Sequence, residues 1–148
     1  MEAVIFVGIQ GAGKSTFYKE RFFDTHVRIN LDMLKTRHRE ALLLRACLEG
    51  KTRFVVDNTN VTVEQRARYI PITREAGFAV IGYFFDVEPR DAARRNAERS
   101  GKGRVPNKAI YGTHQRLEPP SYDEGFDALY GVTIDTDGRF VVESVLLE

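Results

Sequence analysis

The chain has 148 residues, of which 43% are hydrophobic, and its formal net charge is +1. This length is typical of one compact domain, so we expect a single domain over residues 1–148. The single cysteine, Cys47, excludes a disulfide framework and a cysteine-based zinc site. No stretch approaches the roughly 20 apolar residues of a membrane span, and the first residues lack the basic and long apolar regions of an export signal. We therefore expect a cytoplasmic protein with no membrane partner.

Apolar runs rich in β-branched and aromatic residues predict strands at 3–7, 26–30, 53–57 and 79–85. Segments of helical length and composition separate these runs. Such a repeated pattern predicts a mostly parallel sheet that helices cover on both faces, which is an α/β fold. Two later apolar runs predict a C-terminal hairpin, because "TDG" joins 131–135 to 139–147.

Helix boundaries can also be read from the sequence. Thr62 and Gln65 form a T-x-x-Q capping box before a helical segment that Gly77 ends. Pro71 lies inside this segment and predicts a kink in its helix. Pro89 fits the first turn of the next helix.

The stretch "GIQGAGKST", residues 8–16, matches the phosphate-loop pattern G-x-x-x-x-G-K-[ST] between a predicted strand and a predicted helix. The motif predicts that Lys14 reaches the β- and γ-phosphates of ATP or another nucleoside triphosphate and that Ser15 holds Mg²⁺. We thus expect a P-loop NTPase fold. The predicted nucleotide-binding residues are Gln10, Gly11, Ala12, Gly13, Lys14, Ser15 and Thr16.

Asp57 ends the third apolar run, in "FVVDNTN". P-loop proteins usually place at this position an acid that supports Mg²⁺, so we predict Asp57 as a second metal ligand. An alternative is that its side chain begins an Asx turn, which Asn58, Thr59 and Asn60 also favour. The two roles are compatible.

Asp32 follows the second predicted strand, in "RINLDMLK". In P-loop kinases with a short connection here, an acid faces the γ-phosphate from the acceptor side, where it can take a proton from an alcohol. The alternative is local, since an aspartate before "MLKTRHREALLL" is also a preferred N-cap. Position and residue type alone leave both interpretations open.

A basic segment at about 88–106 predicts a small lid. Residues 90–104 hold six basic residues against two acidic ones, which favours an anionic partner. Arg95 and Arg99 share a helical face before "SGKG", so they can close over the γ-phosphate. The alternative is a solvated face with ion pairs from Asp91 to Arg95 and from Arg94 to Glu98.

Together these stretches resemble the kinase module of the P-loop 5′-hydroxyl polynucleotide kinases, including the kinase half of bifunctional kinase-phosphatases. The resemblance runs through "GIQGAGKSTF", "INLDMLK", "DNTNVTVEQRARY", "RRNAERSGKGRVP" and "IYGTHQRLEPPSYDEGF". It implies that Asp32 is the general base on a 5′-OH and that the catalytic residues are Lys14, Asp32, Arg95 and Arg99.

The resemblance also implies an acceptor site. The family usually has an arginine three residues after the base, and here Lys35 stands in that place, where it would contact the acceptor phosphate. Val105 would pack against the terminal base, and we group Asn58 and Thr59 with these acceptor-binding residues. No phosphatase domain fits in the chain, so we expect a kinase that acts alone or beside a separate ligase or phosphatase.

The expected function is therefore ATP-dependent transfer of the γ-phosphate to 5′-OH ends of DNA or RNA. One alternative is a kinase for a small metabolite such as a sugar, nucleoside or antibiotic, since the net charge is nearly neutral. The other is a non-catalytic nucleotide-binding module, for which Asp32 and Arg99 would have no reaction to support.

Overall fold

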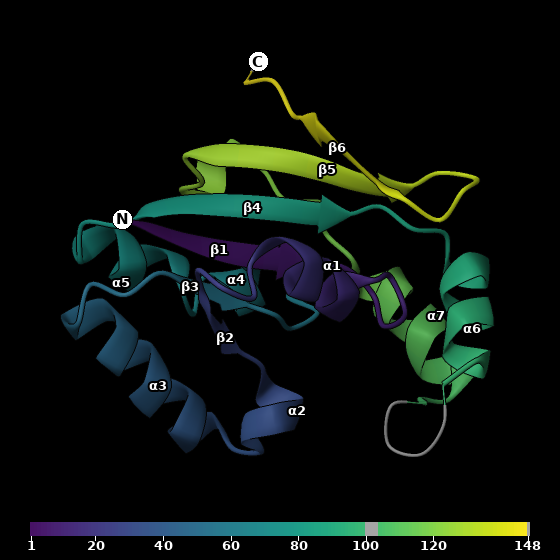
Figure 1. Ribbon diagram of the computed structural model, residues 1–148, viewed down its shortest axis with the longest axis horizontal. Helices are drawn as coiled ribbons and strands as arrows, with labels where there is room; N and C mark the ends of the chain where they lie inside the picture. The colour runs from purple at the N-terminus through teal and green to yellow at the C-terminus, as the bar shows by residue number, and fades with distance from the viewer. Residues whose placement is uncertain (100–103, 148) are drawn as a thin grey trace.

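The computed structural model describes residues 1–99 and 104–147. Within these residues one six-stranded sheet has the order β2-β3-β1-β4-β5-β6 (Figure 1). Its strands are β1 (Glu2–Val7), β2 (Val27–Ile29), β3 (Phe54–Val56), β4 (Ala79–Phe85), β5 (Ala128–Ile134) and β6 (Phe140–Ser144). Neighbouring strands from β2 to β5 are parallel, and only β6 runs antiparallel to its neighbour. The predicted α/β fold with a mostly parallel sheet is confirmed.

The C-terminal hairpin is also confirmed, but its strands differ in length from the prediction. Its first strand begins at Ala128, three residues before the predicted start. The Asp135 carboxylate accepts hydrogen bonds from the N–H groups of Asp137 and Arg139, both at 2.9 Å, which closes the turn. The last strand ends at Ser144, earlier than the predicted run to 147, because Tyr130 opposite Ser144 is the last pair of the ladder. Beyond it the side chains of Leu146 and Leu147 are 80% and 73% exposed.

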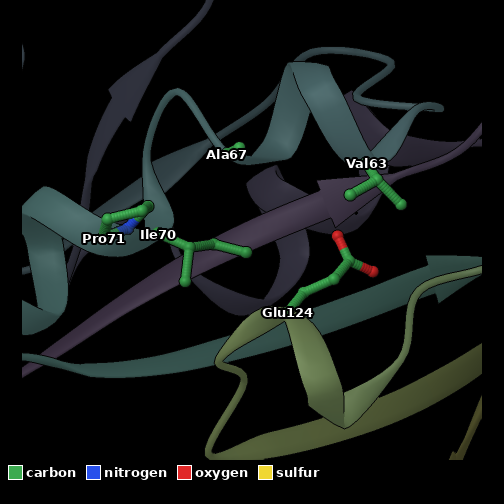
Figure 2. A pocket seen from close by; sticks show the side chains of 5 residues that line it. All are labelled: Val63, Ala67, Ile70, Pro71 and Glu124. Atoms are coloured by element: carbon green, nitrogen blue, oxygen red, sulfur yellow. The ribbon is translucent and has the colours of Figure 1, made fainter.

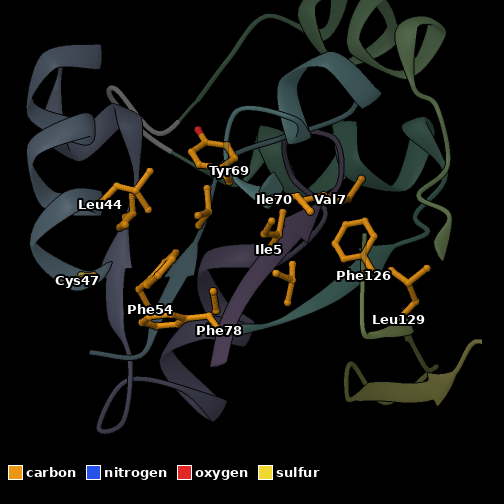
Figure 3. Close-up of a cluster of buried hydrophobic side chains, with 14 residues drawn as sticks. Ile5, Val7, Leu44, Cys47, Phe54, Tyr69, Ile70, Phe78, Phe126 and Leu129 are labelled. Atoms are coloured by element: carbon orange, nitrogen blue, oxygen red, sulfur yellow. The ribbon is translucent and has the colours of Figure 1, made fainter. Parts of the chain in front are cut away.

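The sheet divides the core into two layers, because successive side chains of β1 point to opposite faces. Ala3, Ile5 and Val7 pack with residues of α3 (Arg37–Glu49) and α5 (Ile70–Glu75), in the cluster that Figure 3 shows. Val4 and Phe6 pack on the other face with residues of α1 (Lys14–Arg21), α6 (Pro89–Ala97) and α7 (Asn107–Arg116). The predicted helices on both faces are therefore present.

The segment before Gly77 differs from the expected single kinked helix. It forms two short helices, α4 (Val63–Arg66) and α5, and Pro71 lies in the first turn of α5, where a missing N–H breaks no helical hydrogen bond. Thr62 caps α4 as predicted, since its hydroxyl accepts from the Gln65 N–H at 3.1 Å. The Gln65 side chain accepts from the N–H of Val61, one residue before the cap, so the capping box is not reciprocal.

The carboxyl ends of the parallel strands position the site. The phosphate loop follows β1, α2 (Leu31–Leu34) follows β2, Asp57 follows β3, and α6 follows β4. In open parallel sheets ligands bind at this edge, so four chain-distant segments meet where a substrate would lie. Among the described residues, no helix combines the length and apolar character needed to cross a membrane.

Candidate functional site

The phosphate loop turns tightly between β1 and α1. Gly11 and Gly13 have φ angles of 80° and 96°, in the left-handed region that side chains disfavour. A Cβ on Gly11 would also lie 2.5 Å from the carbonyl oxygen of Ala92 in α6. The loop therefore needs glycine both for its backbone and for its contact with the helix that carries Arg95.

Lys14 is the centre of the site. Its side chain is buried, and the ammonium donates to the carbonyl oxygens of Gly8 at 2.9 Å and Ile9 at 2.7 Å. Burial lowers the pKa of Lys14 to about 8, an effect that nearby Asp57 and Asp32 oppose and nearby Arg99 reinforces. The structure thus brings Asp32, Asp57 and Arg99, predicted from three separate segments, within electrostatic range of one ammonium group.

Ser15 and Asp57 form the candidate metal position. The Ser15 hydroxyl donates to Asp57 Oδ2 at 2.9 Å, and Asp57 is only 2% exposed. A hydroxyl beside a carboxylate at the start of the phosphate-loop helix is the donor set that Mg²⁺ takes in P-loop proteins. The residues present fit the metal, and Ser15 and Asp57 would hold it.

Arg28 is a residue of this site that the sequence did not reveal. From β2 its Nε donates to Asp57 Oδ2 at 2.8 Å and its Nη2 donates to Ser15 Oγ at 3.0 Å. Its guanidinium carbon lies 5.9 Å from the centre of the Tyr18 ring. The only signal in the sequence is a single arginine inside the apolar run "HVRIN".

Asp32 is not the N-cap of the helix that follows it. Asn30 caps α2 by accepting from the Met33 N–H at 2.9 Å, and Thr36 caps α3 by accepting from the Arg39 N–H at 3.1 Å. Lys35, at a φ of 77°, separates the two helices. The capping interpretation of Asp32 is therefore wrong, because the predicted continuous helix is broken and each piece has its own cap. Asp32 lies exposed in the first turn of α2, and Lys35 is exposed at its end.

A buried polar network anchors α2. Asn58 Oδ1 accepts from the N–H of Leu31 at 2.9 Å, while its Nδ2 donates to Glu40 Oε2 at 3.1 Å and to the Tyr69 hydroxyl at 3.2 Å. The Asn30 amide donates to the Asp57 carbonyl at 2.6 Å. Asn58, predicted to contact the acceptor, directs its side chain to this network and so positions the helix that carries Asp32.

Thr59 has a comparable supporting contact, since its carbonyl accepts from the N–H of Gly8 at 2.9 Å. Gln10 donates from Nε2 to the Thr113 hydroxyl of α7 at 3.0 Å, which fixes the loop against that helix. Glu40, which is 2% exposed, and Tyr69 were not singled out from the sequence, because nothing local marks them as neighbours of α2.

The predicted lid lies partly outside the described residues, since 100–103 are not described. In α6, Arg95 donates to the Gly11 carbonyl at 3.5 Å, and burial is the main cause that lowers the pKa of Arg95. Asp91 pairs with Arg94 at 2.6 Å, and not with Arg95 as the solvated alternative required. Arg95 therefore faces the phosphate loop.

Asn96 joins α6 to the far end of the lid. It is 1% exposed, its Oδ1 accepts from the Val105 N–H at 2.7 Å, and its amide donates to the Val105 carbonyl. Val105 is half-buried against the same layer as the phosphate-loop helix. The backbone of Val105 is therefore tied to α6, and sequence reasoning did not identify Asn96 as the residue that does so.

A separate pocket lies between α4, α5 and the 3-10 helix η2 (Tyr122–Glu124). Figure 2 shows its lining by Val63, Ala67, Ile70, Pro71 and Glu124. None of these residues belongs to the site described above. In this region Glu124 accepts two hydrogen bonds, of 2.7 and 2.9 Å, from the buried Arg66. We therefore interpret the region as a structural contact between α4 and η2.

Comparison with known proteins agrees with this architecture. A family profile described as "AAA domain" matches residues 4–120. The chain is 28% identical over 129 residues to a bifunctional polynucleotide phosphatase/kinase from Schizosaccharomyces pombe, covering 84% of this chain and 32% of that protein. It is 24% identical over 164 residues to an L-seryl-tRNA(Sec) kinase from Methanococcus maripaludis, covering 98% of this chain and 63% of that protein. The chain thus spans less than two thirds of the length of either relative.

The fold is shared with solved structures. A crystal structure of a gluconokinase from Sinorhizobium meliloti 1021 superimposes with a TM-score of 0.59 at 18% identity, covering 89% of this chain and 82% of that one. Together with the family match, this likeness confirms the predicted P-loop NTPase fold.

Proposed function

We propose that this chain, which belongs to the AAA domain family, is an ATP-dependent kinase for 5′-hydroxyl ends of DNA or RNA. One observation carries the proposal: exposed Asp32 stands on a helix anchored beside β3, within electrostatic range of Lys14. A carboxylate that is not used as a cap and lies within electrostatic range of the phosphate-loop lysine is suited to accept the proton of an acceptor alcohol. The similarity to a polynucleotide phosphatase/kinase supports a nucleic-acid end as that acceptor.

In the proposed reaction each of these side chains has a distinct role. Asp32 orients the 5′-OH and receives its proton as the oxygen bonds to the γ-phosphorus and the bond to the bridging oxygen of ADP breaks. Lys14, Arg95 and Arg99 neutralise the charge on the transferring group. Mg²⁺, held by Ser15 and Asp57, supplies further neutralisation of the donor phosphates when it is bound.

The acceptor strand would be held mainly by its phosphates. Lys35 follows Asp32 across one turn of α2 and is exposed, so it can contact the phosphate next to the 5′-OH. We keep Thr59 and Val105 in the acceptor site, while Asn58 acts through α2. Phosphate contacts carry no base sequence, so we expect little sequence specificity.

The main rival is a small-metabolite kinase, and the shared fold with a gluconokinase favours it. To separate the two, the protein is incubated with γ-labelled ATP and matched 5′-OH DNA and RNA oligonucleotides, or with a panel of sugars, nucleosides and antibiotics. We expect label on the oligonucleotide ends. Transfer to small molecules alone would overturn the proposal, and oligonucleotides that already carry a 5′-phosphate serve as controls.

A non-catalytic nucleotide-binding module is the remaining alternative. It predicts nucleotide binding with no transfer to any acceptor, and the same assay tests it. A cytoplasmic location and a separate ligase or phosphatase as partner belong to the proposal as well. Co-purification of the tagged protein from its native host tests the partner.

A further inference from the structure

We propose that Arg28 is a positioning residue that competes with Mg²⁺ for Ser15 and Asp57, so that it leaves these oxygens when metal and nucleotide bind. The inference rests on the proposed nucleotide site but not on the identity of the acceptor. Nothing in the phosphate-loop motif requires an arginine at this position of β2.

The contacts of Arg28 hold its guanidinium in one defined position. Its side chain is 27% exposed, whereas that of its partner Asp57 is 1% exposed. Three groups contact the guanidinium: the Asp57 carboxylate, the Ser15 hydroxyl and the Tyr18 ring. Tyr18 is itself fixed, because its hydroxyl donates to the His26 carbonyl at 2.6 Å. A guanidinium bound on three sides is not a solvated surface charge.

The same oxygens cannot serve Arg28 and Mg²⁺ at once. Ser15 Oγ accepts from Arg28 and donates to Asp57 Oδ2, and Asp57 Oδ2 accepts from both. Mg²⁺ requires near-octahedral oxygen ligands at about 2.0–2.1 Å and retains waters around it. A guanidinium 3.0 Å from the ligating hydroxyl occupies that coordination space and adds like-charge repulsion.

Two features allow Mg²⁺ to replace Arg28 at Ser15 and Asp57. Arg28 is the only partly exposed member of the ion pair, so its long side chain can move while Asp57 stays in place. Its Nη1 lies 4.0 Å from Met33 Sδ on α2, which places the guanidinium at the border between the donor side and Asp32. The charge of Arg28 thus neutralises Asp57 before the metal binds and is available beside α2 afterwards.

The test measures Mg²⁺-dependent nucleotide binding without turnover. Fluorescent N-methylanthraniloyl-ADP is titrated with Mg²⁺ in the presence of wild-type protein, Arg28→Gln and Arg28→Lys. Arg28→Gln should lower the half-saturating Mg²⁺ concentration by about two- to fivefold, the range expected for loss of a partly exposed ion pair. Arg28→Lys keeps the charge but cannot bridge both oxygens, so its value should lie in between.

Arg74→Gln is the matched control, because Arg74 forms a surface ion pair with Asp127 at 2.9 Å and contacts no residue of the site. It should leave the Mg²⁺ requirement unchanged. An unchanged or raised requirement in Arg28→Gln would overturn the inference while the nucleotide site stands. If the wild-type protein shows no Mg²⁺-dependent binding of the nucleotide, the proposed function is overturned and the inference with it.

A second measurement follows Arg28 in the wild-type protein itself and needs a variant only to assign the resonance. The Arg28 Nε–H resonance is assigned by its absence in Arg28→Lys and followed by ¹⁵N NMR. Its hydrogen bond to Asp57 should slow exchange with water in protein kept in EDTA, with or without ADP. Addition of Mg²⁺ with ADP should shift the resonance and speed its exchange, and an unchanged resonance would show that Arg28 stays in place.

Discussion

Asn58 Oδ1 accepts a hydrogen bond of 2.9 Å from the main-chain N–H of Leu31, which joins the end of β3 to the first turn of α2. The other end of the same amide reaches Glu40 on α3. One side chain therefore fixes the acceptor-side helix relative to Asp57, which is the residue before it. The position of Asp32 therefore depends on this contact as well as on the local cap that Asn30 provides.

Replacing Asn58 with alanine should have two effects that are measured separately. It should lower the stability of the protein, and it should impair catalysis by the molecules that remain folded. The variant leaves the Leu31 N–H and part of the buried Glu40 carboxylate without partners, so we expect a loss of about 1–3 kcal/mol in the free energy of unfolding. Urea denaturation measures it. In the folded fraction kcat should fall while ADP affinity is retained, because Lys14 and Ser15 are unaffected. Unchanged kcat would show that α2 needs no such anchor.

Asp32→Asn removes the proton acceptor while keeping the size of the side chain. Since Asn30 and Thr36 supply the caps, the thermal midpoint should stay near that of the wild type. Phosphoryl transfer should fall by about 10²-fold or more, the usual contribution of a general base. Asp24→Asn, which changes an exposed aspartate in the turn after α1, is the control and should keep full activity. Comparable activity in both variants would remove Asp32 from the mechanism.

The depressed pKa of Lys14 predicts how nucleotide affinity depends on pH. In the ligand-free protein this lysine loses its proton near pH 8, whereas an ordinary lysine does so near 10.5. Phosphates require the charged ammonium, so ADP affinity should be constant below pH 8 and fall by up to about tenfold per pH unit above it. Isothermal titration from pH 7 to pH 9.5 measures this slope. A flat profile over that range would contradict the burial of Lys14.

The Arg66–Glu124 pair should be a major determinant of stability. Arg66 is fully buried, and its guanidinium also donates to the Asn60 carbonyl at 2.9 Å. Arg66→Ala leaves the buried Glu124 carboxylate without its ion-pair partner, which typically lowers the free energy of unfolding by about 3–5 kcal/mol. Arg74→Ala, which breaks the exposed pair with Asp127, should cost about 1 kcal/mol or less. Denaturant midpoints compare the two, and equal effects would refute the assignment of Arg66.

Sequence reasoning succeeded where the signal was local. The strands were visible as apolar runs, and the phosphate loop was visible as a complete motif next to one of them. Gly13 illustrates this, since the motif requires glycine there and the structure has left-handed backbone at that position. The hairpin turn at Asp135 was equally readable, because its hydrogen bonds lie within four residues.

It failed where strand order decides the neighbours. Arg28 reaches Asp57 only because β2 pairs in parallel with β3, with Arg28 opposite Val55. Glu40, Asn58 and Tyr69 meet only after α3 and the segment beyond β3 fold onto the same face. The role of Asp32 was ambiguous for a different reason, since the sequence could not show that Lys35 would break one predicted helix into two.

The close approach of Gly11 to the Ala92 carbonyl packs the first half of α6 against the phosphate loop. A helix advances about 1.5 Å per residue, so Arg95 lies less than one turn from Ala92, whereas Arg99 lies beyond the end of α6 at Ala97. Arg95 and Arg99 therefore do not share a helical face, and that prediction is wrong because the helix ends before Arg99. A side chain at Gly11 would therefore displace Arg95 together with α6, whereas the position of Arg99 is not set by that helix.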